Sequence, residues 1–200
     1  MRKLEKNQLR SIKRNLNFFF DQATNKDIKE GIAWYKNANT EANRIAKKYS
    51  LDVYKVAQVI SALSPRNKWI QNLKDADKVC EAFVLGLHPT EIKVCTFHSN
   101  KFRAFNILAN NTQITINSLK TYNFVNNIAF LSDQHVTVDI WHLRSCFKNN
   151  IKINNSNIGK LAYQQIKDIT INLANKLGLK PFELQAILWI STQNYFNNKQ

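Results

Sequence analysis

The chain has 200 residues, of which 44% are hydrophobic and 22% are charged. This composition is typical of a globular protein and excludes a disordered chain, a collagen-like chain and a disulfide scaffold. Lys and Arg total 29 against 14 Asp and Glu, and the resulting net charge of +15 points to a polyanionic partner. The alternative is a composition rich in Asn and Lys without any selected partner.

Nothing in the sequence indicates a membrane protein. No stretch reaches the roughly 18 apolar residues of a membrane span, and the first six residues lead into a charged amphipathic segment without a signal-peptide core. We therefore expect a cytoplasmic protein that does not attach to membranes.

The cysteines and histidines argue against a bound metal. Cys80, Cys95 and Cys146 are far apart and form no C-x-x-C pair, and the four histidines form no H-x-x-x-H pair. We expect free thiols, no zinc, no iron–sulfur cluster and no cofactor.

Four glycines and three prolines are too few turn formers for a fold of many short strands, so the sequence favours an all-α protein. Asp52 is placed to cap a helix that Ser64-Pro65 ends, an apolar stripe predicts another helix over 67–85, and Pro181 suits a first turn. Short β-branched stretches at 112–118 and 135–138 predict extended connections or short strands outside any sheet. The remaining helices are predicted at 5–20, 25–37, 41–49, 100–109, 120–131, 139–147, 162–177 and 181–195.

The segment from Asn117 to Arg144 is the one that indicates a chemistry. Lys120 opens a helix after a polar turn, and Asp139 follows Val136-Thr-Val138 and opens the next helix. This layout resembles the helix-hairpin-helix DNA glycosylase superfamily, in which a hairpin lysine precedes an extended step that carries the catalytic aspartate. Arg144 lies where an arginine often follows in that family.

The resemblance continues on both sides of this segment, over roughly residues 44–195. Downstream, Tyr163 to Asn175 and Phe182 to Thr192 resemble the two helices that close the second lobe. Val59-Ile-Ser-Ala-Leu-Ser64 is similar to the family's V-L-L-S-A-Q helix end, and Phe97-His-Ser-Asn-Lys-Phe-Arg-Ala104 to its G-L-Y-N-S-K-A turn. The family's G-x-G hairpin is replaced here by Asn117, Ser118 and Leu119, where Asn117 can adopt a left-handed conformation.

The resemblance implies two helical lobes with a central cleft. One lobe spans 51–135 and carries the hairpin, and the other combines 1–50 with 136–200. Asp139 is expected at the cleft.

The resemblance also implies a role for each of two residues. The Asp139 carboxylate would stabilise the positive charge that develops on the deoxyribose as the base departs, and the alternative is a plain helix N-cap. Lys120 would be a nucleophile that forms a Schiff base with the sugar and confers abasic-site lyase activity, and the alternative is an ordinary phosphate-contacting lysine.

Further residues are expected to hold double-stranded DNA and a flipped-out base. Trp34 and Tyr35 are pocket walls or plain packing. DNA contacts are expected from Arg66, Asn67, Lys68, Lys101, Asn117 and Ser118, and a base pocket from Gln71, Asn72, Asn123, Asn126 and Trp141.

The implied function is a monomeric DNA glycosylase that flips out a modified base and excises it, leaving an abasic site. The chain is similar to small iron–sulfur-free members of phage and anti-phage loci, so the expected base is glucosylated hydroxymethylcytosine in viral DNA, which would make the enzyme an antiviral defence. The alternatives are a housekeeping repair glycosylase, a non-catalytic helical DNA-binding protein and an RNA-binding module, although aromatic-rich RNA signatures are missing.

Overall fold

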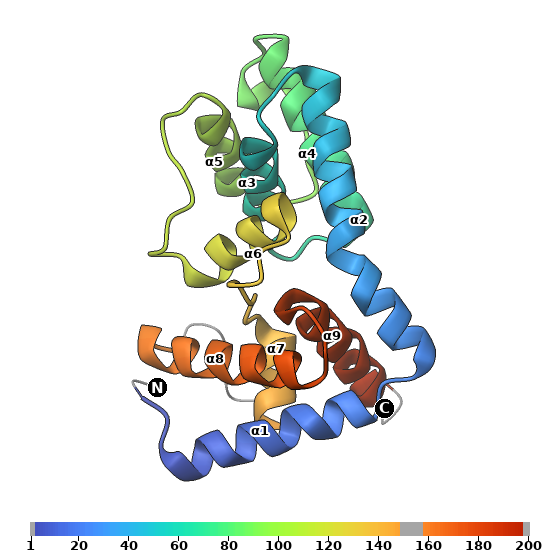
Figure 1. Cartoon of the computed structure of the whole chain (residues 1–200). Helices are drawn as coiled ribbons and strands as arrows, with labels where there is room; N and C mark the ends of the chain where they lie inside the picture. Colours follow the sequence, from blue (N-terminus) through green and yellow to red (C-terminus); the bar gives the residue numbers. More distant parts are fainter. Residues whose placement is uncertain (1–2, 149–157, 198–200) are drawn as a thin grey trace. The chain divides into compact units, whose positions relative to one another are not determined.

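A computed structural model describes residues 3–148 and 158–197, and every regular element in these two ranges is a helix (Figure 1). The all-α prediction is confirmed. In chain order the elements are α1 (Lys6–Asp21), α2 (Asn25–Tyr49), α3 (Val53–Leu63), α4 (Trp69–Val84), the 3₁₀ turn η1 (Pro89–Glu91), α5 (His98–Leu108), α6 (Leu119–Phe130), α7 (Ile140–Phe147), α8 (Lys160–Lys176) and α9 (Pro181–Asn197).

The chain divides into two compact units, each described here by itself. The first unit comprises Met1–Lys36 and Leu131–Gln200, and the second comprises Asn37–Phe130. These limits differ from the expected lobe of 51–135, chiefly because the second half of α2 packs with the second unit. Asn39 shows this packing, since its Nδ2 donates to the carbonyls of Ile128 and Ala129 at the end of α6.

The first unit is built on an amphipathic α1. Ile12, Leu16 and Phe19 recur at steps of four and three and are at most 1% exposed. With this stripe α1 packs on α7, α8 and α9, and α7 and α8 both pack on α9. The start of α9 at Pro181 is as the sequence predicts.

The second unit surrounds α3. Every residue of α3 from Val56 to Leu63 is buried, and the helix packs on α4, α5 and α6. The side chain of Asp52 accepts the backbone N–H of Lys55 at 3.0 Å, so the predicted cap is confirmed. Ser64 follows the last helical residue, also as predicted.

Helix α2 replaces two predicted helices. The sequence analysis ended one helix at 37 and began another at 41, but the buried side of α2 runs through that gap at helical spacing. Its buried members include Gly31, Tyr35, Ala38, Ala42 and Ile45.

The connections at 109–118 and 131–139 contain no strand within the described ranges, so the β-branched stretches are irregular segments. Among the helices of this part of the chain, none has both the length and the apolar character that crossing a membrane requires.

Candidate functional site

Asp139 lies where the 131–139 connection meets α7, at the N-cap position. Its backbone is extended, with φ −96° and ψ −174°, and its Oδ1 accepts the backbone N–H of His142 at 2.8 Å. The capping role is therefore confirmed, and the half-buried carboxylate lies at the positive end of the α7 dipole. The catalytic role of Asp139 stays a prediction.

The connection that leads to Asp139 is held by the side chain of Tyr163, on α8. Val136 and Val138 are 0% and 2% exposed, so their backbone polar groups need partners within the protein. The Tyr163 hydroxyl donates to Val136 O at 2.9 Å and accepts the N–H of Val138 at 3.1 Å. One phenol thus satisfies two backbone groups that a neighbouring strand would otherwise satisfy.

A second tyrosine reaches the same connection through Thr137. The Tyr35 hydroxyl lies 3.0 Å from Thr137 Oγ1 and 2.8 Å from Gln185 Oε1 on α9, and all three side chains are buried. Tyr35 was expected either to form a pocket wall or to pack in the core, and its buried position fits packing. Sequence reasoning missed Tyr163 and Gln185, and no local pattern could have revealed them, since their partners are 25 and 150 residues away.

Trp141 is the one expected base-pocket residue on the helix that follows Asp139. Its ring lies 4.1 Å from the Arg144 guanidinium carbon, and both side chains are half-buried. This cation–π pair holds the indole against α7. Trp34, an expected pocket wall, is half-buried and packs edge-to-face on Tyr35, with ring centroids 4.6 Å apart.

His142, in the first turn of α7, has a buried neutral side chain. Its Nε2 lies 3.0 Å from Thr170 Oγ1, whose own proton goes to Ile166 O at 2.9 Å, so Nε2 carries the imidazole hydrogen. Its Nδ1 has no hydrogen-bond partner. Complete burial lowers the pKa of His142 from 6.5 to about 4.

This lowered pKa makes folding stability fall in acid. Below pH 6.5 the unfolded chain binds a proton at His142 that the folded chain does not accept until about pH 4. The stabilisation is complete above pH 6.5, and about 3 kcal/mol is lost between pH 6.5 and 4. Urea unfolding of wild type and His142→Gln across this range would test this, because the glutamine variant should lose that part of the pH dependence. Parallel profiles for the two proteins would contradict it.

The turn before α6 contains Asn117 and Ser118, both exposed. The backbone N–H of Ser118 donates to Thr115 O at 2.9 Å, and that of Asn117 to Thr115 Oγ1 at 3.4 Å. Asn117 does not take the left-handed conformation that its residue type allows. A phosphate at this turn would compete with Thr115 for both amides. Lys120 lies in the first turn of α6 and is half-buried.

The short connection between α3 and α4 carries the expected DNA-contacting residues Arg66, Asn67 and Lys68. Arg66 and Lys68 are exposed, and Arg66 has a φ of 58°. The Arg66 guanidinium carbon lies 5.7 Å from the ring centroid of Phe97, a side chain that is 51% exposed. Asn67 differs from its neighbours, because its Nδ2 donates to Asp75 Oδ2 at 2.9 Å.

Asp75 is a buried carboxylate that sequence reasoning missed. It is 3% exposed and accepts three hydrogen bonds of 2.9 Å from Asn67 Nδ2, Gln71 Nε2 and the backbone N–H of Cys95. These donors satisfy the charge without a cation. Asp75 therefore ties the connection that bears Arg66 to the segment just before Phe97.

Lys101 is not a surface cation. Its side chain is 4% exposed, and its Nζ donates to the backbone carbonyl of Ile92 at 2.6 Å. The expected DNA contact from Lys101 is corrected on this ground, because the ammonium group stabilises the chain before α5. Spacing alone does not separate such a lysine from an exposed one.

Three expected base-pocket asparagines are also structural. Asn72 is 1% exposed and donates to Ile60 O at 3.0 Å. Asn123 and Asn126, on α6, are buried and donate to carbonyls of their own helix four residues earlier. Gln71 and these asparagines belong to the second unit, whereas Trp141 belongs to the first.

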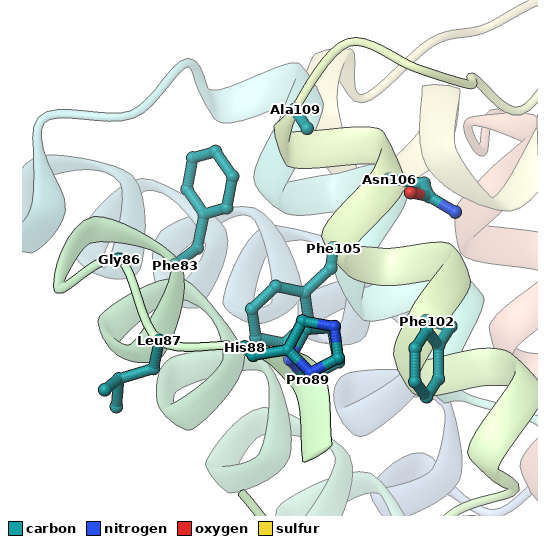
Figure 2. Close-up of a pocket in the computed structure, with 9 residues that line it drawn as sticks. All are labelled: Phe83, Gly86, Leu87, His88, Pro89, Phe102, Phe105, Asn106 and Ala109. Atoms are coloured by element: carbon teal, nitrogen blue, oxygen red, sulfur yellow. The ribbon is translucent and has the colours of Figure 1, made fainter. Parts of the chain in front are cut away.

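Two pockets of the second unit lie elsewhere. One, of about 380 Å³, is lined by Phe83 at the end of α4, by Phe102 and Phe105 on α5, and by His88 (Figure 2). The other, of about 470 Å³, includes Tyr54 and Gln58 of α3. None of the residues expected in the base pocket lines either of them.

The described ranges hold no group of three or more His, Cys, Asp and Glu side chains that could bind a metal ion. All three cysteines are free thiols, as predicted. Burial raises the pKa of Cys80 to about 12 and raises that of Cys146 further.

Comparison with known proteins gives one result. Residues 1–196 match the model of a family of unknown function (DUF7178), so the chain belongs to this family. No curated protein and no solved structure matches it.

Proposed function

We propose that this member of a family of unknown function is a DNA glycosylase that flips out a modified base and excises it, leaving an abasic site. The observation that carries this function best is the placement of Asp139. A half-buried carboxylate follows a buried, doubly anchored connection and opens a helix within the first unit. The helices α3 to α7 and the connections between them follow one another in the order that the resemblance implies.

This placement suits the chemistry of N-glycosidic cleavage. Positive charge develops on the deoxyribose as the base leaves, and a carboxylate that is already oriented stabilises that charge without reorganising. The N–H of His142 fixes one oxygen of Asp139 at 2.8 Å, and the anchored backbone fixes the Cα. Water then attacks the sugar in the simplest form of the reaction.

Double-stranded DNA is the proposed partner, and both units contribute basic residues. The second unit holds twelve Lys and Arg against six Asp and Glu, and the first unit has a similar excess. Because the amides of Asn117 and Ser118 bond to Thr115, we assign the phosphate contacts of the second unit chiefly to side chains such as Arg66 and Lys68.

Duplex binding should therefore weaken steeply with salt. If about five to seven phosphates are neutralised, a plot of log K against log salt has a slope of about −4 to −6. Fluorescence anisotropy with a labelled duplex between 50 and 300 mM salt would measure the slope. A slope near zero would show that the +15 charge reflects composition alone.

Lyase activity depends on Lys120 in this proposal. If its amine attacks the sugar, borohydride reduction during turnover traps a covalent protein–DNA adduct, and Lys120→Ala removes the adduct. The matched control is Lys93→Ala, an exposed lysine of the same unit, which should leave trapping unchanged. Excision without any adduct would make the enzyme monofunctional, with Lys120 as a phosphate contact.

The proposed base is glucosylated hydroxymethylcytosine in viral DNA. Its sugar hydroxyls need hydrogen bonds that replace those lost to water, so the site must be wide and partly polar. The test incubates the protein with glucosylated phage DNA, ordinary DNA and oligonucleotides that carry uracil, alkylated or oxidised bases, and counts abasic sites. Abasic sites in the glucosylated DNA alone support an antiviral role, whereas excision of a common lesion alone supports housekeeping repair.

A second candidate is a non-catalytic helical DNA-binding protein. The capping bond from His142 N to Asp139 is the observation that favours it, because this bond accounts for an aspartate at this position without any chemistry. Tight, salt-dependent duplex binding without abasic sites on any of these substrates would establish this candidate.

A further inference from the structure

We propose that Tyr163 is a positioning residue for Asp139, with Tyr35 in a supporting role. This role rests on the proposed glycosylase function, since it concerns how the first unit holds the carboxylate that acts on the sugar. Neither tyrosine needs to touch DNA, and each acts through the backbone or side chain of the connection before α7.

The contacts of Tyr163 are suited to this task. Its hydroxyl joins Val136 O at 2.9 Å and Val138 N at 3.1 Å, so it bridges the connection up to the residue just before Asp139. Tyr163 is 6% exposed and belongs to α8, which packs on α1 and α9. No strand of residues 3–148 or 158–197 lies beside the connection, so this phenol takes the place of a sheet partner.

Loss of the Tyr163 hydroxyl would release the backbone between Val136 and Val138. Val136 O and Val138 N would remain buried without this partner, and the connection would shift or open to satisfy them. Any shift moves the Cα of Asp139, which is bonded directly to Val138. A displacement of about 1 Å at a reacting group can lower a rate by about 100-fold.

Tyr35 restrains the same connection from α2. Its hydroxyl joins Thr137 Oγ1 and Gln185 Oε1, so the residue between the two valines is tied to α9. The contact goes through a side chain and not through the backbone that leads to Asp139. Tyr35→Phe should therefore lower the excision rate less than Tyr163→Phe does.

The experiment measures single-turnover excision by Tyr163→Phe with enzyme in excess, at a temperature where thermal melting shows the variant to be fully folded. We expect the rate to fall by about 10- to 100-fold while the Kd for DNA stays within about two-fold. Tyr54→Phe is the matched control, because it also removes one phenol hydroxyl, in the second unit, and it should keep the wild-type rate.

A double variant separates positioning from a general structural role. In an Asp139→Asn background, Tyr163→Phe should leave the residual rate unchanged, because the group that it positions is already gone. If Tyr163→Phe lowers the rate equally in both backgrounds, or leaves the wild-type rate unchanged, the positioning role is wrong.

A measurement independent of activity keeps the role testable should wild type excise no base. Hydrogen exchange at the Val138 amide should accelerate at least 10-fold in Tyr163→Phe, beyond the change expected from its overall stability, and should not change in Tyr54→Phe. Unchanged exchange would show that Tyr163 does not hold the connection. Suppose that wild type excises no base, but that exchange at Val138 still accelerates in Tyr163→Phe. This result would overturn the glycosylase proposal, and it would still show that Tyr163 anchors the connection before Asp139.

Discussion

Asp139→Asn is expected to lower base excision by about 100- to 1,000-fold while leaving duplex binding intact. In the proposed reaction, the substitution removes the negative charge that would stabilise the developing sugar cation, but it keeps the size of the side chain. Asn also accepts a hydrogen bond as an N-cap, so the bond from His142 N and the start of α7 should persist. Abasic-site formation and the Kd for duplex DNA are the two quantities to measure.

Asp133→Asn is the control for a change of charge within the same unit. Asp133 pairs with Lys180 at 2.6 Å on the surface, and exposed ion pairs of this kind contribute little to stability. Its excision rate should match that of wild type. An Asp139→Asn protein with a rate within a few-fold of wild type would show that the carboxylate is only a cap.

Gly31→Ala should destabilise the protein by about 2 to 3 kcal/mol, although alanine is the better helix former by about 1 kcal/mol. Gly31 lies where α2 crosses α9, and a Cβ there would lie 2.7 Å from the backbone N of Ile187 and 2.8 Å from its Cα. Backbone atoms cannot turn away as a flexible side chain can. Relief therefore requires α2 and α9 to separate within the first unit.

Urea denaturation would measure this loss of stability. Asn37→Ala, at an exposed position of α2, is the control and should change stability by no more than about 0.5 kcal/mol. Stability equal to or above that of wild type in Gly31→Ala would contradict the close crossing of α2 and α9.

The helices could be predicted from the sequence where local signals agree with burial. Asp52 and Pro181 mark helix starts correctly because caps and first turns act over three or four residues. The sequence at 37–40, Asn-Ala-Asn-Thr, suggests a break because Asn and Thr are weak helix formers. The buried stripe through Ala38 and Ala42 overrides this preference, since packing of a helix outweighs the propensity of single residues.

The candidate site was predictable only in part, because some of its contacts join near neighbours in sequence and others join distant helices. The cap at Asp139 is a contact between near neighbours in sequence, so residue type and position suffice to predict it. The anchors at Tyr163 and Tyr35 depend on how distant helices pack, and nothing local distinguishes these tyrosines from others. Asn72 and Lys101 were misassigned for the converse reason, because burial turns polar side chains toward backbone carbonyls.

Because the three thiols differ in burial, a dye can be attached to one of them, Cys95 in the second unit. Cys95 is exposed, whereas Cys80 and Cys146 are buried with pKa values raised far above the ordinary range. A maleimide dye at neutral pH would therefore label the native protein at Cys95 with no engineered cysteine. Cys95 lies two residues before Phe97, and its backbone N–H donates a hydrogen bond to Asp75. Such a dye would therefore test the proposed binding of DNA beside Arg66, whose guanidinium group lies over the Phe97 ring.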